Sequence, residues 1–245
     1  MPSGRSVVIN GDLGSGKSTV STLLAARLGV RRISVGDLYR ELAQQRDMTA
    51  LELNLHAELD DKIDHYVDRL QNDIATSGET VIVDSRLAWH FFRDALKVHL
   101  VTDPEVAAQR ALDRPPDTVE SYTSLAEARR RLAERSESER LRFIDRYGVD
   151  KTRLHNYDLV CDTTRATPEE IVARIIEVLS TPPGELRLFI DPQRIQLSDG
   201  RDEGPIRLAY DRPHFHAVEG QEAIAAAARD GITLVPATLS GYLGG

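Results

Sequence analysis

The residue run with the clearest chemical meaning lies near the start of the chain, between an apolar segment and a helical pattern. Glycines, a lysine and hydroxyl side chains follow one another there as G-x-x-x-x-G-K-S-T, and the set is Gly11, Gly14, Ser15, Gly16, Lys17, Ser18 and Thr19. Such glycines allow backbone N–H groups to surround a polyphosphate, and the helix that follows adds a positive N-terminal dipole. We expect Lys17 to reach the β- and γ-phosphates and Ser18 to bind Mg²⁺. The run therefore predicts that the chain binds a nucleoside triphosphate.

A second candidate ligand for Mg²⁺ ends the apolar run 81–83. Asp84 follows three consecutive apolar residues, and Ser85 and Arg86 come next. A carboxylate at the end of a strand beside a phosphate loop is suited to the outer shell or the ligand set of Mg²⁺. Asp84 or Ser85 as the N-cap of a following helix is the alternative, and both interpretations can hold together.

The stretch 129–146 is rich in arginine. Arg135, Glu139 and Arg142 are spaced i, i+4 and i+7, which places them on one face of a helix. A carboxylate between two guanidinium groups would hold them toward phosphate oxygens, and phosphoryl transfer needs cations for the charge on the moving group. Arg110 and Arg114 are candidate additions to this cluster. A solvated helix face is the alternative for any one of these arginines.

An acceptor site is suggested by residues 34–40. Gly36 follows an apolar strand pattern, and Arg40 lies on the helical pattern that comes next. A glycine at a strand end followed by a helical arginine suits an acceptor phosphate. A simple turn with a solvated arginine is the alternative.

The elements that must position these residues follow from periodicity. Short apolar runs at 6–10, 32–34, 80–84, 97–101 and 158–162 alternate with helical patterns, clearest at 62–76 and 169–179. This alternation predicts an α/β fold in which helices cover a parallel sheet.

Pro182-Pro183-Gly184 ends the α/β pattern, because this tripeptide cannot continue a helix. Beyond it we expect strands at 186–190 and 234–239 and an alanine-rich helix at 221–230. We therefore predict a domain over residues 1–180, a linker over 181–184 and a small α+β domain over 185–245. We expect that this second domain supplies no residue for phosphate transfer and that the first domain carries out the chemistry.

Composition excludes several classes of protein. The 245 residues are 41% hydrophobic, carry a net charge of −8 and include a single cysteine, Cys161. An acidic chain is unsuited to general nucleic-acid binding, and one cysteine rules out a disulfide framework within the chain. No apolar stretch is long enough to span a membrane. We expect a cytoplasmic protein that binds neither nucleic acid nor membrane.

The first 180 residues resemble a cytidylate kinase of the compact archaeal type. The resemblance is carried by the phosphate loop and by 34–43, 85–88, 135–143, 147–150, 157–160 and 168–172. It implies a P-loop nucleoside monophosphate kinase fold with ATP as co-substrate and Mg²⁺ as cofactor. By this resemblance Arg40 and Arg86 bind the acceptor nucleotide, Arg135 and Arg142 handle the transferring phosphate, and Glu139 lies near the acceptor sugar. Two positions depart from the family pattern, Val35 before Gly36 and Asp84-Ser85 before Arg86.

Residues 185–245 more weakly resemble the ParB/sulfiredoxin-like fold. The stretch 214–237 carries this likeness, with a strand, a glycine turn, a helix and a second strand in that order. The basic residue that the fold usually places after the glycine is absent here, since Gln221-Glu222-Ala223 follows Gly220. His214 and His216 are two positions apart on the expected strand, so they could face the same side. They could bind a metal ion as a pair, but the simpler interpretation is that both are solvated or hydrogen-bonded histidines.

The residues and the resemblance together predict phosphorylation of a nucleoside monophosphate, most simply CMP, dCMP or a modified cytidylate. Two alternatives remain open. The two departures at Val35 and Asp84 allow a P-loop kinase that acts on a non-nucleotide metabolite. The extra domain allows a regulatory protein that binds a nucleoside triphosphate and uses the tail for a dimer contact or a protein partner.

Overall fold

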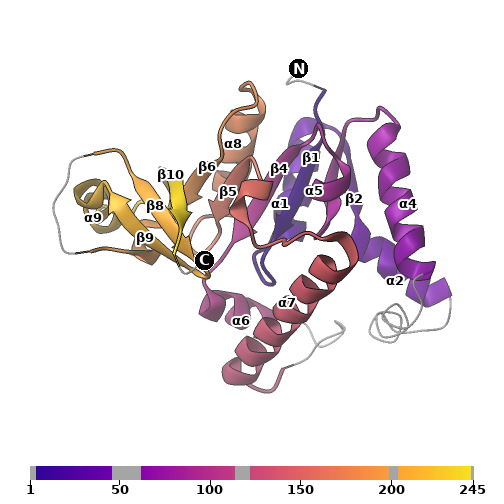
Figure 1. Cartoon of the computed structure of the whole chain (residues 1–245), viewed down its shortest axis with the longest axis horizontal. Helices are drawn as coiled ribbons and strands as arrows, with labels where there is room; N and C mark the ends of the chain where they lie inside the picture. Colours follow the sequence, from indigo (N-terminus) through magenta and orange to yellow (C-terminus); the bar gives the residue numbers. More distant parts are fainter. Residues whose placement is uncertain (1–3, 46–61, 114–121, 199–203, 244–245) are drawn as a thin grey trace.

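A computed structural model describes residues 4–45, 62–113, 122–198 and 204–243 of the chain. In it, one sheet of ten strands runs through the molecule in the order β2-β3-β1-β4-β5-β6-β10-β8-β9-β7. In Figure 1 the amino-terminal part lies on the right, and the carboxy-terminal strands continue the sheet to the left.

The first half of the sheet is parallel. Its strands are β2 (Arg31–Ser34), β3 (Val81–Asp84), β1 (Val7–Gly11), β4 (Leu96–Val101) and β5 (Leu159–Asp162). All four residues of β3 and of β5 are buried, as expected for parallel strands covered on both faces. The carboxyl ends of these strands therefore meet at one edge, which is where ligands bind in open α/β sheets.

Helices connect and cover these strands. They are α1 (Lys17–Leu28), α2 (Val35–Gln45), α4 (Lys62–Thr76), α5 (Ala88–Phe91), α6 (Pro104–Leu112), α7 (Leu125–Tyr147) and α8 (Pro168–Leu179), with a 3₁₀ turn, η1, at Leu154–Asn156. Sequence signals set their ends. Thr167 and Glu170 form a capping box at the start of α8, with Pro168 at the first helical position. Gly148, at φ 66°, ends α7 in the left-handed conformation.

The predicted alternation of strands and helices is confirmed. Each expected apolar run forms one of the five parallel strands, and the expected helices at 62–76 and 169–179 are α4 and α8. Among the described residues, no helix is long and apolar enough to cross a membrane.

The carboxy-terminal extension, which we define as residues 185–243, adds the remaining elements. These are β6 (Arg187–Ile190), the 3₁₀ turn η2 (Pro192–Arg194), β7 (Ile195–Gln196), β8 (Arg207–Asp211), β9 (His214–Glu219), α9 (Gln221–Arg229) and β10 (Val235–Tyr242). The expected order of strand, glycine turn, helix and strand is found in β9, Gly220, α9 and β10. The short strand β7 has no counterpart in the sequence prediction, because two residues carry no periodicity.

The extension is joined to the rest of the sheet across the expected boundary. β6 pairs in parallel with β5, and β10 pairs antiparallel with β6. The two parts of the chain on either side of residues 181–184 also share a hydrophobic core. Val101, Leu154 and Val160 pack in one buried cluster with side chains of the extension such as Leu188 and Phe215. The Pro-Pro-Gly segment therefore changes the direction of the chain without separating two sheets.

Candidate active site

The phosphate loop connects β1 to α1 in a conformation that needs its glycines. Gly14 has φ 80°, and a Cβ there would lie 2.8 Å from the carbonyl oxygen of Ala107. A Cβ on Gly11 would lie 2.5 Å from the carbonyl oxygen of Leu100. Both distances are too short for a side chain, so the loop lies directly against β4 and α6 and its backbone is held in place before any ligand binds.

Lys17 starts α1 and folds back over the loop. Its Nζ donates to the carbonyl oxygens of Gly11 at 3.0 Å and Asp12 at 3.2 Å. The pKa of Lys17 is lowered to about 8, chiefly by burial and also by the nearby cations Arg86 and Lys151, whereas the charges of Asp84 and Glu139 oppose this shift. A polyphosphate would replace those carbonyl contacts with charged ones. The loop also leaves the buried Ser15 hydroxyl without a hydrogen-bond partner among the described residues.

Ser18 and Asp84 form the expected candidate site for Mg²⁺. The Ser18 hydroxyl donates to Asp84 Oδ2 at 2.9 Å, so a hydroxyl and a carboxylate oxygen lie side by side at the carboxyl end of β3. In the described part of the chain, no group of three or more His, Cys, Asp or Glu side chains is arranged to hold a metal ion. Mg²⁺ usually takes one or two protein oxygens and completes its shell with phosphates and water, so the adjacent oxygens of Ser18 and Asp84 suit this ion.

Arg32, which the sequence analysis did not single out, contacts the carboxylate of Asp84. Its Nη2 lies 2.9 Å from Asp84 Oδ2, and its Nε donates to the Ser21 hydroxyl at 2.7 Å. It also pairs with Asp37 at 3.1 Å. Arg32 therefore holds Asp84 in place from β2. No local pattern pointed to it, because its partners come from α1, α2 and β3.

Glu139 of α7 gathers three cations. Arg86 pairs with one of its oxygens, Arg135 Nε lies 3.1 Å from the same oxygen, and Lys151 Nζ donates to the other at 2.8 Å. The Glu139 side chain is only 8% exposed. Burial by itself would raise the pKa of Glu139, but the charges of Arg86, Lys151 and Arg135 outweigh it and lower the pKa to about 2.

The predicted fork of Arg135, Glu139 and Arg142 is therefore arranged differently. The i, i+4 contact between Arg135 and Glu139 is present, but the Arg142 guanidinium lies 5.6 Å from the centre of the Phe143 ring. Arg86 and Lys151 take the place expected for Arg142 at the carboxylate. The physical reason is that β3 and the segment after α7 bring cations to the helix that sequence spacing alone does not show.

Lys151 is a second functional candidate that was missed from the sequence. Its side chain is 10% exposed, and its backbone carbonyl accepts a hydrogen bond of 2.7 Å from the buried Tyr157 hydroxyl. Tyr157 stacks on His99, with ring centroids 4.6 Å apart. One signal was available: the chain has only four lysines, and Lys151 is one of them.

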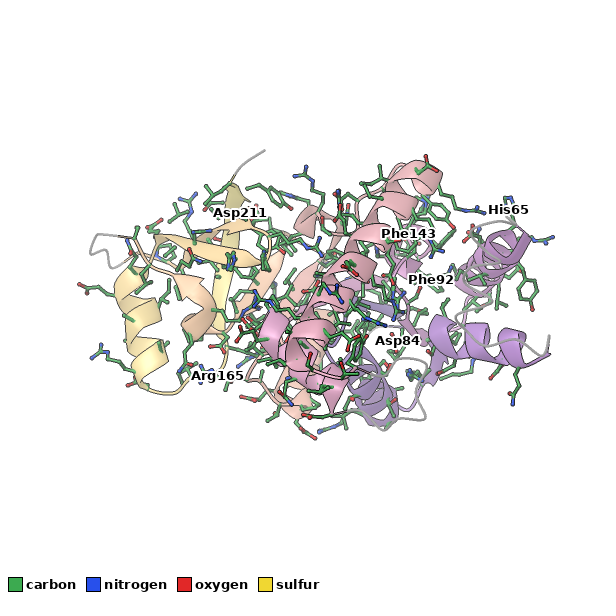
Figure 2. The ribbon with its side chains drawn as sticks, turned by 90° about the horizontal axis from the view of Figure 1, so that it is seen from below. His65, Asp84, Phe92, Phe143, Arg165 and Asp211 are labelled. Carbon is green, nitrogen blue, oxygen red and sulfur yellow. The ribbon has the colours of Figure 1, made fainter. Side chains whose placement is uncertain are left out.

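The remaining predicted residues have these positions. Gly36 is exposed in the first turn of α2. Arg40 belongs to α2, but its side chain lies outside the described part of the structure, as does the whole of Arg114. Arg110 donates to the carbonyl oxygen of Thr163 at 2.6 Å, beside the phosphate loop. Figure 2 labels Asp84 at the end of β3 and Phe143 of α7.

Comparison with known proteins finds a matching family model and relatives of similar sequence. Residues 7–154 match the family model of an AAA domain. A cytidylate kinase of Natronomonas pharaonis is 40% identical over 169 residues, which cover 68% of this chain and 85% of that protein. A cytidylate kinase of Methanobrevibacter smithii is 33% identical over 173 residues, which cover 71% of this chain and 97% of that protein.

Solved structures share the fold at low sequence identity. An uncharacterized protein from Eubacterium ventriosum is 13% identical with a TM-score of 0.55, over 73% of this chain and 99% of that one. Shikimate kinase from Bacteroides thetaiotaomicron is 18% identical with a TM-score of 0.51, over 72% of this chain and 99% of that one. At these identities the likeness concerns the fold alone.

Proposed function

Because this chain belongs to the cytidylate kinase family of nucleoside monophosphate kinases, we propose that it transfers the γ-phosphoryl group of ATP to CMP or dCMP. The observation that carries the proposal is a phosphate loop next to a cluster of cations. Lys17 and Ser18 belong to the loop, and Glu139 of α7 gathers Arg86, Arg135 and Lys151 close enough for their charges to act on Lys17. This is the arrangement that a donor triphosphate and an acceptor monophosphate need.

The reaction is an in-line displacement without a covalent enzyme intermediate. A 5′-phosphate oxygen of the acceptor forms a bond to the γ-phosphorus of ATP, the bond to the β-phosphate oxygen breaks, and ADP leaves with the electron pair. Lys17, Arg135 and Arg142 are assigned to the charge on the transferring group. Arg40, Arg86 and Gly36 are assigned to the acceptor.

The geometry suggests a more specific role for Glu139. Its carboxylate is occupied by Arg86, Arg135 and Lys151, so we assign it to holding these cations in position. Its contact with the acceptor sugar stays a prediction of the family resemblance. Preorganised cations stabilise a transition state without reorienting during the reaction.

Ser18 and Asp84 would hold Mg²⁺ beside the phosphates, where the ion would neutralise charge on the β- and γ-oxygens. Arg32 and Ser21 keep the Asp84 carboxylate oriented toward Ser18. Exclusion of water is assigned to closure over the phosphate loop, which would limit hydrolysis of ATP.

One assay tests the proposal. ATP consumption is measured in a coupled assay with CMP, dCMP, UMP, AMP, GMP and shikimate as acceptors. We expect CMP or dCMP to give the highest kcat/KM. A preference for shikimate would favour a metabolite kinase, and tight ATP binding without turnover on any acceptor would favour a regulatory protein. A dimer or partner contact through the extension, and its ParB/sulfiredoxin-like ancestry, stay predictions.

A further inference from the structure

The turn between β8 and β9 reaches the helix that carries the catalytic candidates. Arg212 lies in this turn, and its Nη2 donates to the hydroxyl of Ser136 in α7 at 2.7 Å. Ser136 directly follows Arg135. A residue of the extension is thus in contact with the middle of α7, 76 positions earlier in the sequence. Figure 2 labels Asp211, the residue before Arg212.

A buried ion pair fixes this turn to the ligand edge of the sheet. Asp162, the last residue of β5, is fully buried and pairs with Arg194 at 2.8 Å. The same guanidinium donates through Nη2 to the carbonyl oxygen of Pro213 at 3.1 Å. The Arg194 side chain is 11% exposed. Asp162 and Arg194 therefore hold the turn at the carboxyl end of β5, the edge where parallel sheets bind ligands.

The charge of Arg212 is only weakly compensated by its neighbours. Within the described part of the chain, the carboxylate paired with it is Glu137 at 3.9 Å, and that carboxylate already receives two hydrogen bonds from Arg140 at 2.9 and 2.7 Å. The hydroxyl of Ser136 is neutral. The Arg212 side chain is 33% exposed, so its guanidinium has donors available for an anion.

The charge of Arg212 acts on a histidine that lies beside the phosphate loop. His99 of β4 lies 3.9 Å from Asp12 of the loop. Burial lowers the pKa of His99 to about 4, and the positive charges of Lys17, Lys151 and Arg212 act in the same direction. Burial also raises the pKa of Tyr210, two residues before Arg212, and the charge of Asp12 adds to that effect. Arg212, Asp12 and Lys17 thus belong to one electrostatic neighbourhood.

We propose that Arg212 is a phosphate-binding residue supplied by the extension, which contacts the terminal phosphate of the bound triphosphate during transfer. The identity of the reaction rests on the proposed function, whereas the contact with the triphosphate does not. Arg194 is then a positioning residue that acts through the turn. This proposal replaces the expectation that the extension contributes nothing to the chemistry. Arg212 lies outside residues 7–154, which match the family model.

The test uses the full chain with Arg212→Gln and Arg212→Lys. Arg207→Gln is the matched control, because Arg207 lies in the same hairpin but pairs at 3.5 Å with Glu219 on the surface. Dissociation constants of ATP and ADP are measured by calorimetry without an acceptor, and kcat and KM are measured with CMP. Thermal unfolding of each variant confirms that it folds.

Arg212→Gln is expected to weaken ATP binding about tenfold while ADP binding changes less than about threefold, and to lower kcat about 10²-fold. Arg212→Lys should recover part of both losses, because it keeps the charge, and Arg207→Gln should behave as the unmodified chain. If Arg212→Gln leaves the ratio of the ADP and ATP dissociation constants unchanged, the proposal is overturned and Arg212 is a structural tether. Failure of the unmodified chain to phosphorylate both CMP and dCMP would refute the proposed function, yet the comparison of ATP with ADP would still decide the role of Arg212.

Discussion

At the scale of single residues, the charge of Lys17 depends on its surroundings. Its ammonium group donates to two backbone carbonyls and is surrounded by low-dielectric protein, so burial lowers its pKa to about 8. The phosphates of ATP would favour the charged form and raise that pKa again. Binding of the nucleotide and protonation of Lys17 are therefore linked.

This linkage gives a pH dependence with a definite sign. Above about pH 8 the free protein loses the Lys17 proton, so ATP affinity should fall as the pH rises from 7 to 9. ATP binding should take up a fraction of a proton near pH 8 and almost none at pH 6. Calorimetry in two buffers that differ in ionisation enthalpy measures this uptake. Lys17→Ala should abolish it and Lys97→Gln should not; equal uptake by the unmodified chain and Lys17→Ala would contradict the assignment.

Local sequence was sufficient to predict the phosphate loop, because its nine residues act through their own backbone. Ser18 and Asp84 also meet as predicted, at 2.9 Å, since both follow from strand ends in a parallel sheet. Arg32 and Lys151 were missed because their roles depend on partners from other elements. The local sequence around a charged residue does not indicate which carboxylate from another element it will pair with in the fold.

At the scale of elements, α7 organises the cluster of cations around Glu139. The helix begins at Leu125 with the Ser124 side chain as its N-cap and ends at Tyr147. Along it, Arg135 and Glu139 lie toward the site, and Leu132 and Phe143 are buried in the core. Helical periodicity predicted the face correctly. It was wrong about which guanidinium meets Glu139, because Arg86 arrives from the end of β3.

Glu139→Gln should destabilise the fold. The substitution leaves Lys151, Arg86 and Arg135 close together without the carboxylate between them, and removing one partner of a buried pair typically costs about 3 kcal/mol or more. Because the folded pKa of Glu139 is about 2 against 4.5 unfolded, this stabilisation is present above about pH 4.5 and is lost as the pH falls toward 2.

Urea unfolding at pH 7 and at pH 3 measures this effect. The variant should be much less stable than the unmodified chain at pH 7, and the difference should shrink at pH 3. Glu137→Gln is the control, since Glu137 is about half exposed and pairs with Arg140 at the surface, where such pairs contribute about 1 kcal/mol or less. Equal stabilities of the two variants at pH 7 would show that the Glu139 cluster adds nothing to the fold.

Substitutions of the arginines assigned to the transferring phosphate and of those assigned to the acceptor should have different effects on kcat and KM. Arg135→Ala and Arg142→Ala should lower kcat more than they raise the KM of ATP, because their contacts strengthen in the transition state. Arg86→Ala and Arg40→Ala should mainly raise the KM of the acceptor. Arg229→Ala, at the end of α9 in the extension, is the control. If all four variants behave like the control, the acceptor site has been misplaced.

At the scale of the whole molecule, the extension continues the sheet of the first part of the chain, because β6 pairs in parallel with β5. The expected strands at 186–190 and 234–239 and the expected helix at 221–230 correspond to β6, β10 and α9, whereas β7 and β8 were not predicted. The proline-rich break was interpreted as a boundary between two domains. Pro182-Pro183-Gly184 indicates only that a helix ends there. Whether the next strand joins the existing sheet depends on the free edge of β5 and on the apolar side chains around it, and neither can be read from residues 181–184.

A chain that ends at Thr181 should therefore lose its cooperative fold. It would leave β5 as an open edge and expose Val101, Leu154 and Val160, which pack against the extension in the intact molecule. A buried side chain of this size contributes about 1.5–3 kcal/mol, and whole domains are stable by only about 5–15 kcal/mol. An unpaired apolar strand edge also favours aggregation.

Circular dichroism melts and size-exclusion chromatography compare this truncated chain with the full one. We expect a broad or absent transition and soluble aggregates for the truncated chain. Tyr242→Phe in the full chain is the control, because it removes only the hydroxyl that lies 3.0 Å from His155 Nδ1 and leaves β10 in the sheet. It should cost about 1 kcal/mol. A truncated monomer that melts sharply within a few degrees of the full chain would mean that β6 to β10 are an independent addition, and Arg212 would then have to reach the phosphate loop from a unit that the kinase fold does not need.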